Sequence, residues 1–116
     1  MRIISKTKLR EFAEIHPDAQ AALDQWHNSV IHAIWHMPQD VRATYRQADP
    51  IGDSFVVFNI CRNDYRLVVR VDYSRLIVYI FGLYTHAAYS RLDLRALDKQ
   101  IQHDLKANRR SESGDR

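Results

Sequence analysis

The sequence contains few of the features that mark secreted or membrane proteins. Its single cysteine, Cys61, cannot form a disulfide within the chain. No stretch approaches the roughly 20 apolar residues that a transmembrane helix needs. Residues 1–5 also lack the long apolar region of a secretory signal. From these absences we expect a cytoplasmic protein with no membrane partner.

Glycine is scarce as well, with three residues in the chain. The chain has no P-loop, no dinucleotide-binding fingerprint and no Gly-x-Ser-x-Gly elbow, which excludes the common nucleotide and hydrolase motifs. The net charge is +3, which is compatible with nucleic-acid binding and equally with an ordinary basic protein. A length of 116 residues indicates one domain. We expect this domain over residues 1–107, followed by a polar, disordered tail at 108–116.

Apolar residues in the N-terminal half recur at the spacing of helices. After a short strand at residues 3–4, a first helix is predicted to end at His16, before Pro17. A second helix should end at Pro38, with one more turn at residues 41–45 and a loop at 48–53. Trp35 lies outside the apolar stripe of this helix. It either packs within the domain or belongs to a patch that binds a protein partner. The predicted buried stripe of this second helix is Ala19, Leu23, Trp26, Val30, Ile34 and Met37.

The pattern changes to that of strands after residue 54. Three segments rich in β-branched and aromatic residues, 55–60, 65–73 and 76–83, are separated by short polar gaps, which indicates antiparallel hairpins. In the middle segment, alternate residues should point to opposite faces of the sheet. One face would carry Tyr65, Leu67, Val69 and Val71, and the other Arg66, Val68, Arg70 and Asp72.

The C-terminal part adds a turn and a helix. Thr85 is a suitable N-cap for a short helix that carries His86 and Tyr89, and an apolar stripe from Leu94 to Leu105 follows. The sequence therefore predicts an α+β fold. Two N-terminal helices would pack on a small antiparallel sheet of three to four strands, with a C-terminal helix.

Two groups of residues offer weak alternatives for a site. His32 and His36 have the spacing of a shared metal site on a helix, but no further ligands occur at a recognisable spacing, so they also fit a solvated polar face. Cys61 stands next to Arg62 and is either a reactive thiol or a small apolar residue at a strand end. We expect no metal and no cofactor.

The most promising constellation combines arginine, histidine and tyrosine. Arg66 and Arg70 share one face of the predicted sheet, and His86 and Tyr89 follow its last strand one helical turn apart. Cleavage of RNA needs a base for the ribose 2′-OH, a cation for the charged phosphorane and an acid for the leaving oxygen. Arginine grips phosphate oxygens, histidine transfers protons, and tyrosine donates a proton or stacks on a base. The alternative is an arginine paired with Asp64 or Asp72, and a histidine in a turn.

The ordered set of motifs resembles the HigB family of RelE-like toxins. The resemblance rests on residues 58–69, on Val-Tyr-Ile at 78–80 followed by Thr-His-Ala-Ala-Tyr at 85–89, and on residues 1–5 and 16–19. It covers about the first 93 residues in the same order. The chain departs from the family pattern at Phe81, where relatives often have a basic residue, and at Tyr84, where they often have a small one.

The resemblance implies a RelE-like fold and an mRNA interferase, often one that acts on ribosome-associated message. It also implies a cognate HigA-type antitoxin with a helix-turn-helix domain, through which the complex binds operator DNA. By carry-over, the catalytic residues are Arg66, His86 and Tyr89. The expected RNA contacts are Arg62, Asn63 and Arg70, with Asn63 also suited to the hairpin turn. The alternative is a decayed toxin that only binds its antitoxin or RNA.

Overall fold

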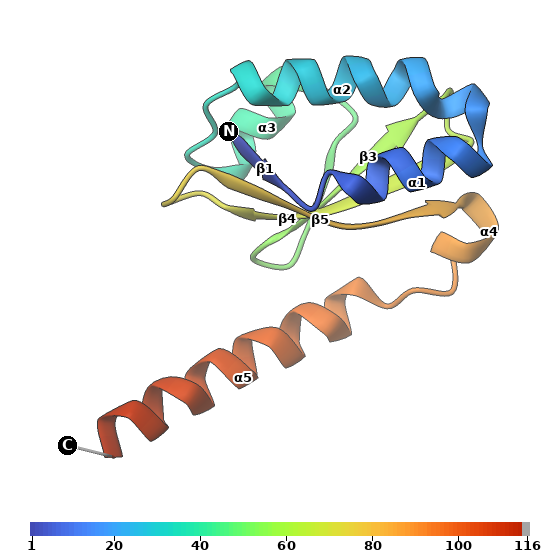
Figure 1. Cartoon of the computed structure of the whole chain (residues 1–116). Helices are drawn as coiled ribbons and strands as arrows, with labels where there is room; N and C mark the ends of the chain where they lie inside the picture. Colours follow the sequence, from blue (N-terminus) through green and yellow to red (C-terminus); the bar gives the residue numbers. More distant parts are fainter. Residues whose placement is uncertain (115–116) are drawn as a thin grey trace.

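The computed structural model describes the backbone of residues 1–114 and the side chains of residues 1–105 (Figure 1). Strands and helices segregate along the chain, with most strands in its middle. In order, the elements are β1 (Arg2–Ile4), α1 (Thr7–Ile15), the 3₁₀ turn η1 (Pro17–Ala19), α2 (Gln20–His32), α3 (Pro38–Thr44), β2 (Asp49–Ile51), β3 (Phe55–Ile60), β4 (Tyr65–Asp72), β5 (Ile77–Thr85), α4 (His86–Tyr89) and α5 (Leu94–Gly114).

The strands form one five-stranded sheet in the order β1-β5-β4-β3-β2. The two predicted hairpins are confirmed, because β3, β4 and β5 pair antiparallel in sequence order. The predicted strand number and purely antiparallel sheet are wrong, since β1 pairs parallel with β5. The loop expected at residues 48–53 also contains β2, which pairs with β3 despite Pro50. A proline is tolerated there because β2 is an edge strand whose outer side needs no N–H donor.

Helices cover both faces of the sheet (Figure 1). The three N-terminal helices α1, α2 and α3 lie on one side, and α5 lies on the opposite side. We call the first side the helix-packed face and the second the α5 face. The helix-packed face centres on Phe58, whose ring meets those of Trp26, Tyr45 and Trp35 at centroid distances of 5.4, 5.3 and 6.2 Å. The predicted inward set of β4 is confirmed as part of this core.

The predicted C-terminal end of α2 is wrong. The helix ends at His32, and Ala33 is extended, so Ile34 and Met37 are 65% and 48% exposed instead of completing the buried stripe. Trp35 is 1% exposed, and its indole donates to Thr44 Oγ1 at 3.0 Å. Of the two alternatives for Trp35, packing within the domain is therefore the correct one. Pro38 accounts only for the extended backbone of Met37 directly before it, and it begins α3 itself.

The α5 face has a smaller core, formed by Ile51, Phe55, Val57, Val68 and Leu94. Leu94 belongs to the first turn of α5, which confirms a C-terminal helix that begins on the sheet. The tail predicted at 108–116 falls where the side chains lie outside the described residues, and it stays a prediction. Over the described residues, no helix is both long and apolar enough to cross a membrane.

Candidate active site

Arg66 occupies the centre of the candidate site on the α5 face. In the sheet it lies opposite Asn59 of β3 and Tyr84 of β5, and its side chain is half-buried. Its Nη1 donates to the carbonyl oxygen of Asn63 at 2.8 Å and to that of Tyr65 at 3.3 Å. The guanidinium is therefore fixed by the backbone of the preceding turn, and its remaining N–H groups can bind a ligand.

The turn between β3 and β4 has an unusual backbone that supports this arrangement. Cys61, Arg62 and Asn63 have φ angles of 54°, 55° and 75°. Left-handed residues cost energy unless the surrounding structure holds them, and asparagine tolerates this region best. The expected turn role of Asn63 is thus confirmed, and its carbonyl oxygen also orients Arg66. The side chains of Arg62 and Asn63 are exposed at the end of the hairpin.

The short helix α4 begins beside the same end of the sheet. Thr85 lies opposite Tyr65 in the β4–β5 ladder, and its Oγ1 accepts a hydrogen bond from the Ala88 N–H at 3.3 Å. The predicted N-cap is therefore confirmed. The cap positions His86 in the first turn with an exposed side chain and places Tyr89 one turn later, where it is half-buried.

Arg66 and Tyr89 meet across the sheet and α4. The guanidinium carbon of Arg66 lies 6.0 Å from the centroid of the Tyr89 ring, at the outer limit of a cation–π contact. Burial, reinforced by the negative charge of Asp49, raises the pKa of Tyr89 above its ordinary value, and Arg66 acts in the opposite direction. The phenol is therefore protonated at neutral pH and can donate a proton. Among the described residues, the exposed His86 side chain forms no hydrogen bond.

Arg70 has other contacts. It lies four residues beyond Arg66 on the same face of β4, about 13 Å along the strand. Its Nε donates to Ser54 Oγ at 3.4 Å, and its guanidinium carbon lies 5.9 Å from the centroid of the Phe55 ring. The structure does not bring Arg70 to Tyr89; it places Arg70 beside the attachment of α5.

Asp98 makes that attachment and was not singled out from the sequence. It is 5% exposed, and its two carboxylate oxygens accept hydrogen bonds from the Asp53 N–H and the Ser54 hydroxyl, both at 3.0 Å. Gly52 permits the approach, because a Cβ there would lie 2.3 Å from Asp98 Oδ2. The one available signal was an acidic residue four positions after Leu94, within the apolar stripe of α5.

The two departures from the family pattern both fall on the α5 face. Phe81 packs edge-on against Phe55, with ring centroids 5.2 Å apart, in the small core beneath α5. Tyr84 lies opposite Arg66, and burial raises the pKa of its phenol. Gly82 makes room for that ring, since a Cβ there would lie 2.6 Å from the Tyr84 hydroxyl. An apolar residue at 81 thus suits a face that α5 partly covers.

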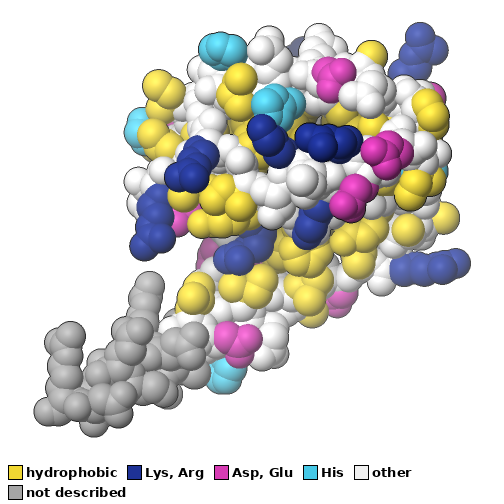
Figure 2. All heavy atoms as spheres, viewed as in Figure 1, with side chains coloured by type: hydrophobic (Ala, Val, Ile, Leu, Met, Phe, Trp, Pro, Cys, Tyr) yellow, Lys and Arg dark blue, Asp and Glu magenta, His cyan; other side chains and the backbone are white. Residues whose placement is uncertain are grey.

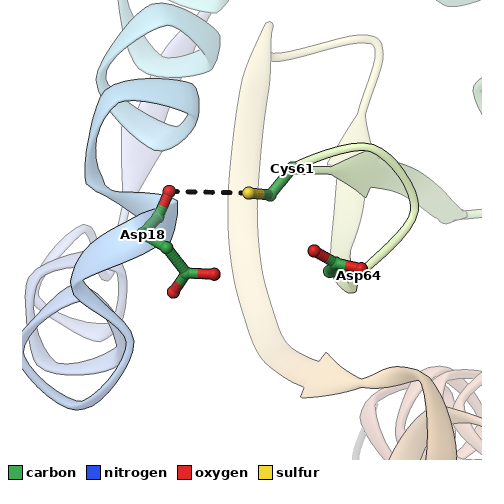
Figure 3. Close-up of side chains that lie close together, drawn as sticks. All are labelled: Asp18, Cys61 and Asp64. Carbon is green, nitrogen blue, oxygen red and sulfur yellow. Dashed lines mark hydrogen bonds between the residues drawn. The ribbon is translucent and has the colours of Figure 1, made fainter.

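Potential metal ligands gather elsewhere. In the part of the chain with described side chains, one group of three stands out, Asp18, Cys61 and Asp64, with ligand atoms within 4.8 Å of one another (Figure 3). The Asp18 carboxylate already accepts the Tyr65 hydroxyl at 2.9 Å, and the Cys61 thiol donates to the Asp18 carbonyl oxygen at 3.5 Å. These contacts join the β3–β4 turn to η1, which gives the cluster a structural role.

The two histidines considered as metal ligands are separated by the end of α2. His32 is its last residue, with Nδ1 2.8 Å from the Asn28 carbonyl oxygen, and His36 lies beyond it in the bend before α3. The helical spacing that would let both imidazoles share a metal is therefore lost.

The fold and the site define a small α+β protein with basic and aromatic side chains on an open face, suited to phosphodiester chemistry. Figure 2 shows Lys and Arg side chains spread over one side of the body, and apolar ones where it meets α5. The model of one family, HigB_toxin, the RelE-like toxic component of a toxin-antitoxin system, matches residues 19–92. The chain belongs to this HigB toxin family.

Several curated proteins are similar to the chain. They include mRNA interferase toxin HigB of Escherichia coli K12 and the proteins named mRNA interferase HigB of Escherichia coli O157:H7 and Shigella flexneri. Each is 26% identical over 91 residues, which cover 77% of this chain and 88% of the relative. The resemblance seen in the motifs is thus confirmed for the family.

Proposed function

We propose that this chain is an endoribonuclease that cleaves mRNA and acts as the toxin of a type II toxin–antitoxin pair. The observation that carries the proposal is the contact of Arg66 with Tyr89 on an open face, where the guanidinium carbon lies 6.0 Å from the centroid of the phenol ring. His86 lies one helical turn before Tyr89 in α4. These side chains supply a permanent cation, a neutral phenol and an imidazole. The relatives named mRNA interferases support the choice of RNA as the substrate.

The three groups match the steps of RNA cleavage by internal transfer. His86 takes the proton of a ribose 2′-OH, whose oxygen then attacks the adjacent phosphorus. Arg66 stabilises the extra negative charge of the phosphorane, since its guanidinium is charged and can bind two oxygens. Tyr89 gives its proton to the leaving 5′ oxygen. The bond to that oxygen breaks, leaving a 2′,3′-cyclic phosphate and a free 5′-OH end.

Tyr89 is a better proton donor than His86 for a physical reason. A tyrosine acts as a base only if its pKa is depressed, and the pKa of Tyr89 is raised mainly by burial. His86 is exposed, so its imidazole is accessible to a ribose hydroxyl.

The remaining predicted RNA contacts divide between two regions. Arg62 and Asn63 are exposed at the hairpin end next to Arg66 and would contact the flanking RNA backbone. Arg70 is engaged with Ser54 and Phe55 below α5, so we assign it a mainly structural role. A comparison of Arg66 with Arg70 therefore separates catalysis from support within one strand.

The proposed partners follow from the family. We propose a HigA-type helix-turn-helix antitoxin that neutralises the chain and carries the complex to operator DNA, and cleavage on translating ribosomes in the cytoplasm. The second candidate function is a decayed toxin that binds antitoxin or RNA without cutting. Phe81 favours it, because an apolar ring occupies a position near the site where a cation would assist phosphate binding.

The test is induced expression in a bacterium without the antitoxin, followed by mapping of RNA 5′ ends. The wild-type chain should create new 5′-OH ends within translated messages. Arg66→Ala and His86→Ala should lower cleavage by about 100-fold or more, as expected for loss of a group that acts in the transition state. The matched control Arg70→Ala removes the same charge from the same strand and should retain most of the cleavage.

Circular dichroism and thermal unfolding of the purified variants establish that each is folded. Equal loss with Arg66→Ala and Arg70→Ala would contradict the assigned site. A folded wild-type chain that cuts no RNA and copurifies with a helix-turn-helix protein would favour the decayed toxin.

A further inference from the structure

A β-bulge in β5 determines which of its side chains share a face with Arg66. The register between β4 and β5 shifts next to Val68, which leaves Phe81 as an extra residue in β5. Strict alternation would otherwise place Leu83 on the same face as Phe81. Because of the shift, Leu83 packs in the large core of the helix-packed face, and Tyr84 lies on the α5 face. Bulges often redirect a side chain beside an active site, and this one brings Tyr84 to the side of Arg66.

The ring of Tyr84 lies along β5, over the glycine two residues earlier. A Cβ at Gly82 would lie 2.6 Å from the Tyr84 hydroxyl oxygen and 2.9 Å from its Cζ, so the outer end of the ring covers the backbone of Gly82. The ring also packs against the small core that contains Val68. It is only half-buried. Part of an aromatic surface is therefore held in place and stays accessible to a ligand.

Two aromatic rings extend from Arg66 in opposite directions along the sheet. Tyr84 lies directly opposite Arg66 in the β4–β5 ladder, where paired Cα atoms are about 5 Å apart. The Arg66 guanidinium is directed to the hairpin end, where it meets the Asn63 carbonyl oxygen and the Tyr89 ring. The Tyr84 ring points the other way, toward Gly82. The cation is thus flanked by a ring on each side.

This arrangement fits a single strand of nucleic acid. Unpaired bases stack on aromatic rings, and arginine binds the phosphates between them. When Arg66 holds one phosphate, the base of a neighbouring nucleotide can therefore lie on Tyr84. Burial raises the pKa of Tyr84 above its ordinary value, so the phenol stays neutral and does not repel phosphate. A base-paired duplex would not fit, because its base faces are already stacked inside the helix.

We propose that Tyr84 is a base-stacking residue, which binds the base of a nucleotide next to the phosphate that Arg66 holds. The proposal deepens the proposed function and rests on it. It gives the departure from the family pattern at residue 84 a role in substrate binding, since a small residue there offers no ring. The contact favours unpaired RNA without reading one sequence, because every base has an aromatic face.

The first test measures binding of a single-stranded RNA with 2′-O-methyl riboses, which lacks the attacking hydroxyl and stays intact. Tyr84→Leu removes the aromatic ring and should weaken binding about tenfold, as expected for the loss of one stacked base. Tyr84→Phe keeps the ring and should bind like the wild type. The matched control is Tyr79→Leu, which should have little effect. Tyr79 is a half-buried tyrosine of the same strand and face, opposite Arg70 instead of Arg66.

A second variant, Gly82→Ala, displaces the ring without removing it. Gly82 does not have a positive φ, so its backbone accepts alanine. The added methyl group would overlap the hydroxyl end of Tyr84, which is the free end of a side chain and can swing away. Gly82→Ala should therefore lose most of the affinity that Tyr84→Leu loses, and the double variant should lose little more. Circular dichroism shows whether each variant is folded; if Gly82→Ala is not, the comparison of Tyr84→Leu with Tyr84→Phe decides.

Oligonucleotides with a single abasic nucleotide locate the stacked base. Removing the base at one position should weaken binding to the wild type about tenfold. It should hardly affect binding to Tyr84→Leu, because the ring and the base contribute through one shared contact. Tyr79→Leu should retain the full loss at that position.

The outcomes separate the stacking residue from the nuclease. RNA cleavage by the wild type, with unchanged binding in folded Tyr84→Leu, would overturn the stacking role and leave the nuclease intact. Equal losses with Tyr84→Leu and Tyr79→Leu would also overturn it, since a general effect on the sheet would explain both. A Tyr84 dependence confined to a copurifying protein would overturn it in favour of a protein partner. RNA binding that depends on Tyr84, in a chain that cuts no RNA, would support the stacking role and remove the nuclease.

Discussion

The two faces of the sheet differ in how completely they are covered. On the helix-packed face, α1, α2 and α3 cover the sheet, and two tryptophans and a tyrosine surround Phe58. On the α5 face, a single helix rests on a small core, and Arg66, Tyr84 and Tyr89 stay half-buried beside it. Complete burial favours stability, whereas partial burial leaves charged and phenolic groups accessible to a substrate and still holds them in place.

Adjacent residues of one strand therefore have different tasks. In β4, Leu67 and Val69 are fully buried in the large core, while Arg66 and Arg70, beside them in sequence, point to the α5 face. A rigid strand fixed by packing on one side can position a catalytic group on the other more precisely than a loop can. The comparison predicts that the two faces respond differently to substitution.

The largest effect is expected from removing a buried ring on the helix-packed face. Phe58→Ala should lower the free energy of unfolding by about 3–5 kcal/mol, because the surrounding rings cannot close the cavity. Phe55→Ala deletes an equally buried ring from the α5 face of the same strand. It should cost less, since α5 can shift toward the gap. Urea unfolding of both variants measures the difference, and equal losses would contradict the contrast between the faces.

A smaller effect is expected from releasing α5. Asp98→Ala removes the acceptor of the Asp53 N–H and the Ser54 hydroxyl, and hydrogen bonds to a charged group contribute about 1.5–3 kcal/mol. Hydrogen exchange should become faster at Asp53 and in the first turns of α5, with β4 and β5 unchanged. Asp104→Ala is the matched control, because this exposed acid of α5 has Gln100 as its one hydrogen-bond partner among the residues whose side chains are described. Faster exchange throughout the sheet would show instead that α5 stabilises the whole domain.

The smallest effect concerns Tyr65 on the helix-packed face, and it depends on pH. The hydrogen bond to Asp18, together with burial, raises the pKa of Tyr65 to about 12. The unfolded value is about 10, so the contribution is complete below pH 10 and is lost as the pH rises from 10 toward 12. The urea midpoint of the wild type should fall more steeply above pH 10 than that of Tyr65→Phe. Parallel curves would contradict the assigned bond.

Local patterns predicted much of the fold because local physics determined it. Alternation in β4 assigned its two faces, the polar gaps assigned both hairpins, and Thr85 marked the start of α4. The errors arose where distant segments decide. The parallel pairing of β1 with β5 joins residues some 75 positions apart, and β2 is a strand only because β3 offers an edge to pair with.

The candidate site also combines residues that local patterns predicted with contacts that distant segments determine. The residue types and their order pointed to Arg66, His86 and Tyr89, and the contact of Arg66 with Tyr89 agrees with that choice. The sequence placed Arg70 among the expected RNA contacts and did not anticipate its hydrogen bond to Ser54, whose hydroxyl also donates to Asp98 of α5.

The sequence by itself determined the α+β class, the hairpins, the two faces of β4 and the family, since each follows from the spacing and order of neighbouring residues. Tertiary structure alone decided the mixed sheet, the burial of Trp35, the attachment of α5 by Asp98 and the separate surroundings of Arg66 and Arg70. Those features depend on contacts between residues far apart in the chain, and such contacts have no periodic signature in the sequence.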